Sequence, residues 1–170
     1  MSVEPCILRV TPEEFARLRE RPETLAAYIE NGYETGAFAF DWSPAKPLSR
    51  MLHLDEFAMW LLTDFDDDTP LCQALIGWDG PQLDEATHGH GAVFYSDPQR
   101  VVEIAGALAA MPENHLRERF ESRAEDFRRS ASGFADDDAI LAHQRIHMQR
   151  LLEFYRRAAE QGDFILLMLV

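Results

Sequence analysis

The chain is organised around residues 87–98, Thr-His-Gly-His-Gly-Ala-Val-Phe-Tyr-Ser-Asp-Pro. This stretch combines a turn with two glycines, a short apolar run and the start of a helix. Glycines permit tight turns and a close approach of a ligand to the backbone, and two histidines, His88 and His90, stand within this turn. We therefore expect a ligand-binding turn, then a short strand, then a helix that begins with a capping box formed by Ser96 and Gln99.

The candidate ligand-binding residues are those of the turn and one aromatic residue after it: His88, Gly89, His90, Gly91 and Tyr95. Alternate residues of a strand point the same way, so His88 and His90 can hold zinc if a third ligand joins them. They can equally be ordinary turn residues. The sequence offers no third ligand nearby, so we predict no metal and no cofactor.

Apolar segments at the two ends of the chain predict strands at residues 6–10 and 164–170. The second is continuously apolar, which is typical of a central strand covered on both faces. Residues 101–109 and 137–161 carry apolar side chains at helical spacing, and Gly162 ends the second helix. This order of elements predicts an α+β fold, with a small mixed sheet packed by several helices.

Further local patterns add expectations between these elements. Thr11, Pro12 and Glu14 form a helix-start signature, and a second short helix is expected to end at Gly32 as a left-handed cap. Residues 71–76 are apolar and can form either a strand or a helical turn. The remaining segments are expected to be a packed loop with one short strand (33–53), a buried helix (55–63) and a charged helix (113–129).

The charge of the chain restricts its partners. It has 170 residues, a formal net charge of −14 and a pI of about 4.7. Nucleic acids and anionic membranes require a basic surface, so we predict binding to neither. The acidic surplus suits a basic protein partner, and residues 64–68 and 136–138, which are rich in aspartate, are the predicted contact points.

The two cysteines, Cys6 and Cys72, are too few for a disulfide framework and lie in apolar contexts. The sequence has no signal peptide and no apolar run of about 18 residues, so we expect a cytoplasmic protein without a membrane span. It also contains neither a phosphate loop nor a Gly-x-Ser-x-Gly nucleophile elbow.

A second histidine pair stands on the last predicted helix. His143 and His147 are four residues apart, a spacing that can place two imidazoles on one metal. Gln144 follows His143 where a zinc protease requires glutamate, which excludes that class. The other interpretation is a pair at the boundary of the apolar face that hydrogen-bonds to its neighbours.

Three blocks of this sequence resemble the YfbM-like family, a bacterial domain of unknown function. The blocks are Leu54-Asp55 with Trp60-Leu61-Leu62-Thr63, Gly89-His90-Gly91 through Tyr95 to Val101, and Phe154-Tyr155 with Ala158-Ala159 and Gly162. The resemblance is clearest over residues 54–170 and implies a single α+β domain over residues 1–170. It brings no activity, cofactor or catalytic residue, although it implies that some relatives are toxin-neutralising immunity proteins.

The chain departs from the family pattern directly after the glycines. Relatives have Pro-Ala-Arg there, whereas this chain has Ala92-Val93-Phe94, so any role of that arginine is missing. Our leading hypothesis is a non-enzymatic binding or interaction protein that neutralises a basic partner. The alternative is a small hydrolase or metal-dependent enzyme with its site at His88 and His90, with His143 and His147 as further candidates.

Overall fold

The computed structural model of the chain describes residues 5–38, 48–54, 69–77, 80–84, 92–125, 128 and 136–169. The predictions for residues 55–63, 64–68 and 88–91 lie outside these residues. The described elements are β1 (Pro5–Val10), α1 (Pro12–Glu20), a 3₁₀ turn η1 (Pro22–Thr24), α2 (Leu25–Glu34), β2 (Met51–His53), α4 (Pro70–Leu75), β3 (Gln82–Asp84), β4 (Val93–Ser96), α5 (Pro98–Ala109), α6 (His115–Ser122), α8 (Asp137–Gln161) and β5 (Phe164–Leu169).

The strands form one sheet in the order β2-β1-β5-β4-β3. The last strand, β5, occupies the centre, as its continuous apolar sequence predicted. Each described pair of neighbouring strands is antiparallel, so the α+β class is confirmed but the prediction of a mixed sheet is wrong. Strand direction depends on where each connection returns the chain, which the strand sequences do not specify. The edge strands β2 and β3 were not assigned to the sheet because each is only three residues long, too short for a clear alternation.

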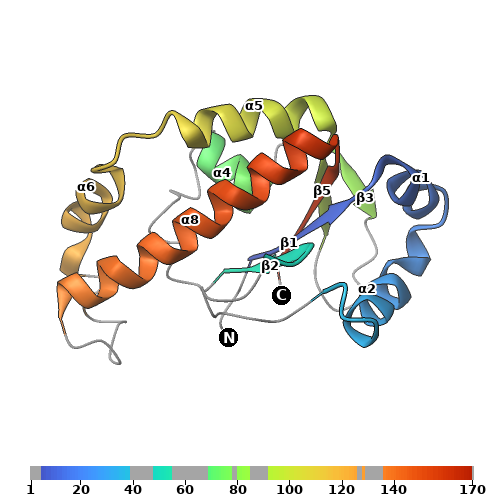
Figure 1. Cartoon of the computed structure of the whole chain (residues 1–170), viewed down its shortest axis with the longest axis horizontal. Coiled ribbons are helices and arrows are strands. Elements are labelled where there is room, and N and C mark those ends of the chain that lie inside the picture. Colours follow the sequence, from blue (N-terminus) through green and yellow to red (C-terminus); the bar gives the residue numbers. More distant parts are fainter. Residues whose placement is uncertain are drawn as a thin grey trace.

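The two faces of the sheet carry two separate apolar cores, because successive strand residues point to opposite sides. The helix-bundle face, which includes Ile7 and Leu167, packs against α4, α5, α6 and α8. The pocket face, which includes Leu8 and Leu166, packs against α1 and α2. In Figure 1, α5 and α8 run side by side on one side of the strands, and α1 and α2 lie at one end of the molecule, away from α6.

The starts of α1 and α5 follow local capping rules, but the cap of α5 is not the predicted one. The Glu14 N–H donates to the Thr11 hydroxyl at 3.2 Å and the Thr11 N–H donates to the Glu14 carboxylate at 2.7 Å, which confirms the predicted box. The predicted box at Ser96 is wrong. Ser96 is instead the buried last residue of β4, and Asp97 caps α5 by accepting the Arg100 N–H at 2.8 Å.

Of the two glycines that were predicted to end helices, one does so and the other does not. Gly162 ends α8 with a φ of 68°, in the left-handed region, as predicted. Gly32 does not end α2 but lies within it, against the ring of Phe38. A Cβ atom at Gly32 would lie 1.9 Å from that ring, so this glycine serves packing, and Gly36, with a φ of 73°, follows the helix instead.

The apolar run at residues 71–76 resolves mainly into helix α4. Thr69 starts it by accepting the Cys72 N–H at 3.2 Å, and Pro70 occupies its first turn. The buried Tyr155 hydroxyl donates to the Ala74 carbonyl at 2.8 Å and so ties α4 to α8. The apolar residues within 101–109 do not all face the core, because Val102 on α5 is 55% exposed whereas Val101 is fully buried.

Charged side chains are concentrated at the surface. None of the helices in the described part is both long and apolar enough to cross a membrane.

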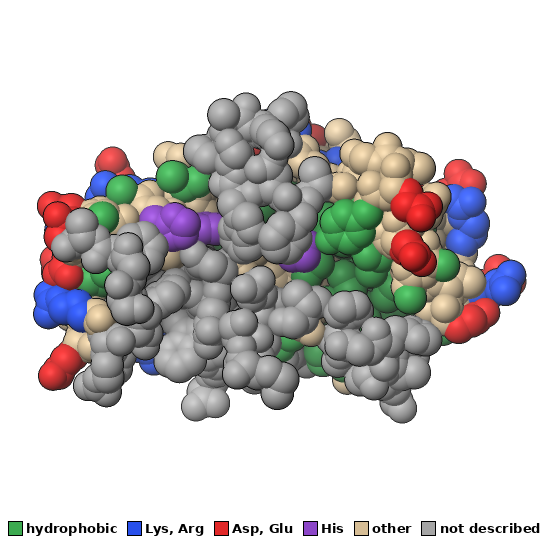
Figure 2. Space-filling model, turned by 90° about the horizontal axis from the view of Figure 1, so that it is seen from below, with side chains coloured by type: hydrophobic (Ala, Val, Ile, Leu, Met, Phe, Trp, Pro, Cys, Tyr) green, Lys and Arg blue, Asp and Glu red, His purple; other side chains and the backbone are tan. Residues whose placement is uncertain are grey.

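On α8, Glu153 accepts hydrogen bonds from Arg156 at 2.8 Å and from Arg157 at 2.6 Å. Figure 2 shows acidic and basic side chains beside one another at both ends of the face seen from below. These ion pairs neutralise some acidic side chains locally, whereas the formal net charge of −14 remains.

Candidate functional site

Of the predicted ligand-binding residues, Tyr95 is the one that the structure describes. His88, Gly89, His90 and Gly91 lie outside the described residues, so their role stays a prediction. Tyr95 is half-buried on β4, and its side chain borders a pocket.

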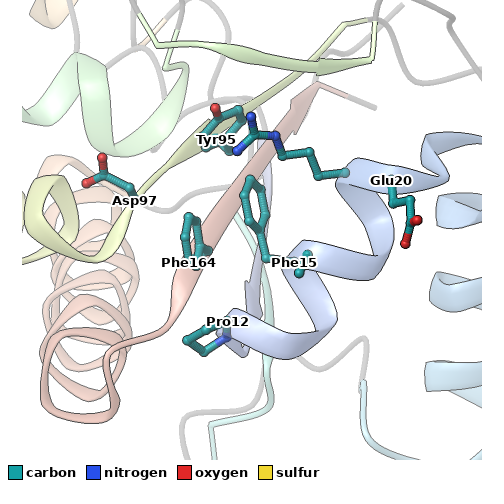
Figure 3. Close-up of a pocket in the computed structure, with 8 residues that line it drawn as sticks. Pro12, Phe15, Glu20, Tyr95, Asp97 and Phe164 are labelled. Atoms are coloured by element: carbon teal, nitrogen blue, oxygen red, sulfur yellow. The ribbon is translucent and has the colours of Figure 1, made fainter.

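The pocket has a volume of about 730 Å³ and lies between α1 and the strands β4 and β5 (Figure 3). Its lining combines aromatic rings with ionic side chains. The described lining residues are Pro12, Phe15, Ala16, Arg19, Glu20, Tyr95, Asp97 and Phe164.

Three aromatic rings from three elements form one side of this pocket. The Phe15 and Phe164 rings are stacked, with centroids 3.9 Å apart and planes at 8°. The Tyr95 ring lies 4.7 Å from that of Phe15. Tyr95 pairs with Leu166 in the register of β4 and β5, so Phe164, two residues earlier, is its diagonal neighbour on the same face. The sheet register and the docking of α1 together create an aromatic surface in which Tyr95 and Phe164 are half-buried and Phe15, between them, is only 4% exposed.

Ionic side chains from α1 and the start of α5 surround these rings. Arg19, Glu20 and Asp97 are exposed, and Asp97 is also engaged as the cap of α5. Among the described lining residues there is no serine, cysteine or histidine that could supply a nucleophile with an adjacent base. This arrangement suits the binding of an apolar or aromatic group that is flanked by charge.

A hydrogen-bond network fixes α1, and with it Phe15, against the sheet. Arg50 donates to both carboxylate oxygens of Glu14, to Oε1 at 3.0 Å, and to the Arg9 carbonyl at 3.1 Å. Burial tends to raise the pKa of Glu14, but the hydrogen bonds from Arg50 and the Thr11 N–H lower it to about 2. Glu14 therefore stays ionised, and its charge-assisted hydrogen bonds are of the stronger kind.

The predicted histidine pair on α8 is in direct contact. The Nε2 atoms of His143 and His147 are 3.1 Å apart. His147 is 3% exposed and Gln144 is 2% exposed, so His147 belongs to the core and not to the predicted boundary. The buried stripe of α8 is wider than its apolar residues indicated. In the described part of the chain, no three His, Cys, Asp or Glu side chains are grouped so that they could hold a metal.

A second polar cluster lies between β1, β2 and α2, and we call it the sulfur–histidine cluster: Cys6, Tyr33, Met51 and His53. The His53 Nε2 atom is 3.7 Å from Cys6 Sγ, 3.2 Å from Met51 Sδ and 3.0 Å from Tyr33 Oη. Burial raises the pKa of the Cys6 thiol to about 12 and lowers the pKa of His53 to about 4. Both groups are therefore uncharged at neutral pH.

Sequence analysis found only one residue of the pocket and none of this cluster. Phe15 and Phe164 read as ordinary apolar positions of a helix and a strand, and their contact depends on the docking of α1. Cys6 and His53 are 47 residues apart in the chain. The one usable signal was Met51-Leu52-His53, because alternation along a strand places Met51 and His53 on the same face.

Comparisons with known proteins agree with this fold. The family model of a domain of unknown function, DUF1877, matches residues 1–168. Among solved structures, the chain is similar to a protein of unknown function, YfbM from Escherichia coli, with 19% sequence identity, a TM-score of 0.64 and coverage of 100% of both chains. At this identity the likeness supports the fold alone. Among proteins with curated descriptions, none matches the chain.

Proposed function

The chain belongs to the DUF1877 family, and from this premise we propose that it is a non-enzymatic interaction protein that binds a basic protein partner in the cytoplasm. The observation that carries the proposal is the pocket with three aromatic rings at Phe15, Tyr95 and Phe164. An apolar or aromatic side chain of the partner enters this pocket, and basic residues on either side of it face the acidic surface.

The aromatic surface supplies the binding energy in this proposal. Interfaces depend on a few side chains that fill well-packed pockets, and aromatic residues are enriched among them. The stacked rings of Phe15 and Phe164 are fixed from two sides, by the Arg50–Glu14 network and by the sheet register. A pocket that exists before binding lowers the cost of ordering the interface.

The charges supply the preference for a basic partner. Two carboxylates, Glu20 and Asp97, border the pocket against one guanidinium, that of Arg19. The whole chain carries a formal charge of −14. A field of this sign speeds the approach of a basic protein and opposes that of an acidic one.

The pocket rim suits this role better than the aspartates at residues 136–138, which we predicted as contact points. Asp137 accepts hydrogen bonds from Arg128, one of them at 3.0 Å, and Asp138 lies 3.8 Å from Arg117. Asp136 caps α8 by accepting the Ala139 N–H at 2.9 Å. Asp137 and Asp138 thus already have arginine partners within the chain, and the other predicted contact point, residues 64–68, lies outside the described part.

The proposal is tested with defined peptides and a variant that fills the pocket. The probe is a dye-labelled peptide with one phenylalanine between lysines, compared with the same peptide carrying alanine and with one flanked by glutamates. We expect the lysine–phenylalanine peptide to bind tightest, and to bind more weakly as salt shortens the Debye length from about 10 Å at 0.1 M to about 3 Å at 1 M. Ala16→Trp, which places an indole at the lining, should remove binding.

Ala27→Trp is the matched control, because Ala27 is exposed on α2 and does not line the pocket. Binding should be unchanged in this variant. Equal binding of the phenylalanine and alanine peptides, or binding that survives Ala16→Trp, would rule out the pocket as the interaction site.

A further inference from the structure

Strand pairing brings the donors of the sulfur–histidine cluster together on one face of the sheet. Cys6 on β1 lies opposite His53 on β2 and opposite Met168 on β5. Side chains directly opposite one another have Cβ atoms about 4.5–5.5 Å apart. Met51 is two residues from His53 and so shares its face, and Cys6, Met51 and Met168 belong to the same buried core. Two sulfur atoms therefore lie beside one imidazole, and Met168 occupies the neighbouring strand position opposite Cys6.

The hydrogen-bonding capacity of His53 does not account for this arrangement. One ring nitrogen carries either one proton or one lone pair, and Met sulfur only accepts. Nevertheless Cys6 Sγ, Met51 Sδ and Tyr33 Oη all lie within 3.7 Å of His53 Nε2. The Tyr33 hydroxyl donates to Met51 Sδ at 2.9 Å, and one hydrogen bond at His53 Nε2 satisfies only one of the three approaches to that nitrogen. A cation among the sulfur and nitrogen atoms would satisfy several lone pairs at once.

The separations match those between ligands of one small metal ion. Bonds of about 2.3 Å to sulfur and about 2.0 Å to nitrogen, at tetrahedral to trigonal angles, place the two ligand atoms about 3.5–3.8 Å apart. Cys6 Sγ and His53 Nε2 are 3.7 Å apart. Met51 Sδ, at 3.2 Å, must retreat slightly, which the flexible, unbranched methionine side chain allows.

The donor set selects the ion. No three His, Cys, Asp or Glu side chains come together in the described residues, so the site depends on thioether sulfur. Soft thiolate and thioether ligands favour copper(I). The charge of the site also favours copper(I). Cys6 and Met51 are only 3% and 2% exposed, so the ion and its ligands would lie in an apolar core. One thiolate neutralises a monovalent ion, whereas a divalent ion would leave a net charge in an apolar core, which is costly.

We propose that Cys6, Met51 and His53 form a copper(I)-binding site at the β1–β2 edge of the sheet, with Met168 as an additional sulfur neighbour. The ion reaches it from the side of Tyr33, which is 40% exposed and whose hydroxyl lies 3.0 Å from the His53 nitrogen. The cysteine proton is released to solvent when the metal binds. The site is separate from the aromatic pocket and does not depend on the proposed interaction function.

The test is an anaerobic titration of the purified full chain with copper(I), in competition with the chelator bicinchoninate. We expect one tightly held copper(I) per chain, with sulfur and nitrogen neighbours in its X-ray absorption spectrum. Substitutions of residues around a metal's direct ligands alone cost about 10–100-fold in affinity, so Cys6→Ala should cost at least about 100-fold. Met51→Leu, which keeps an apolar side chain of similar size, should weaken binding by more than about tenfold.

Cys72→Ala is the matched control, because it removes the other buried cysteine, which lies on α4 in the helix-bundle core. It should bind copper(I) as the parent chain does. If Cys6→Ala does not fold, Met51→Leu still decides the question. A chain that leaves all copper(I) with the chelator, or that holds it equally well after Met51→Leu, would overturn the proposal.

Discussion

The two faces of the sheet differ in what they bury. The helix-bundle face packs apolar residues of β1 and β5, such as Ile7 and Leu167, against α4, α5, α6 and α8. The pocket face, covered by α1 and α2, borders the aromatic pocket and carries the sulfur–histidine cluster. One face is therefore mainly a stability core, whereas the other combines packing with groups able to bind a ligand. Substitutions on the two faces should separate these roles.

The largest effect is expected on the helix-bundle face. Leu167 is 1% exposed and packs against Gly77, where an added Cβ would lie 2.5 Å from its Cδ1 atom. Leu167→Ala should lower the free energy of unfolding by about 2–5 kcal/mol, measured by urea denaturation. Met168→Leu, next to it on the opposite face, should cost less than about 1.5 kcal/mol. Equal losses would show that the cavity left by Leu167→Ala is not the cause of its cost.

A smaller, pH-dependent effect is expected where α1 is held to the sheet. Glu14 has a pKa lowered to about 2, so its contribution is present above its usual pKa of about 4.3 and is lost as the pH falls towards 2. Glu14→Gln should cost about 1.5–3 kcal/mol at neutral pH and flatten the decline in stability across that pH window. Glu13→Gln, at an exposed neighbouring position, should leave the decline in stability with falling pH as steep as in the parent chain. If stability declines equally steeply in both variants, Glu14 is not the source of the decline.

Gly32 tests packing on the pocket face. A Cβ at this position meets the Phe38 ring at 1.9 Å, so Gly32→Ala should destabilise the chain by about 1–3 kcal/mol, the usual cost of overpacking. Gly106→Ala is the control, because nothing lies within 4 Å of its added Cβ. At this exposed position of α5 that change should instead stabilise the chain by about 0.5–1 kcal/mol. Thermal unfolding of both variants shows whether Gly32→Ala lowers the stability and Gly106→Ala raises it.

The smallest effect is expected at Val102, which is 55% exposed although its neighbour Val101 is fully buried. Val102→Ser should change the free energy of unfolding by no more than about 0.5 kcal/mol. Val101→Ser, one position away, should be clearly destabilising. A comparable loss at both positions in urea titrations would restore the wider apolar face that the sequence of α5 suggested.

Local signals were predictable and non-local ones were not. The capping box at Thr11 and the end of α8 at Gly162 depend on a few neighbouring residues, and both were predicted. The predictions for Ser96 and Gly32 were wrong because another role of each residue overrides its local capping signal. Ser96 extends β4, so Asp97 becomes the cap, and Gly32 serves the packing of Phe38. Of the candidate site, Tyr95 alone was identified, because it follows a glycine-rich turn.

The sequence by itself determined the α+β class, the central position of β5 and the negative net charge of the chain. Each follows from composition or periodicity along a single segment, which is readable without the rest of the chain. Only the tertiary structure decided the antiparallel sheet, the stacking of Phe15 on Phe164, and the approach of Cys6 to His53. These contacts join residues far apart in the chain, and their geometry depends on strand register and helix docking, which no single segment encodes.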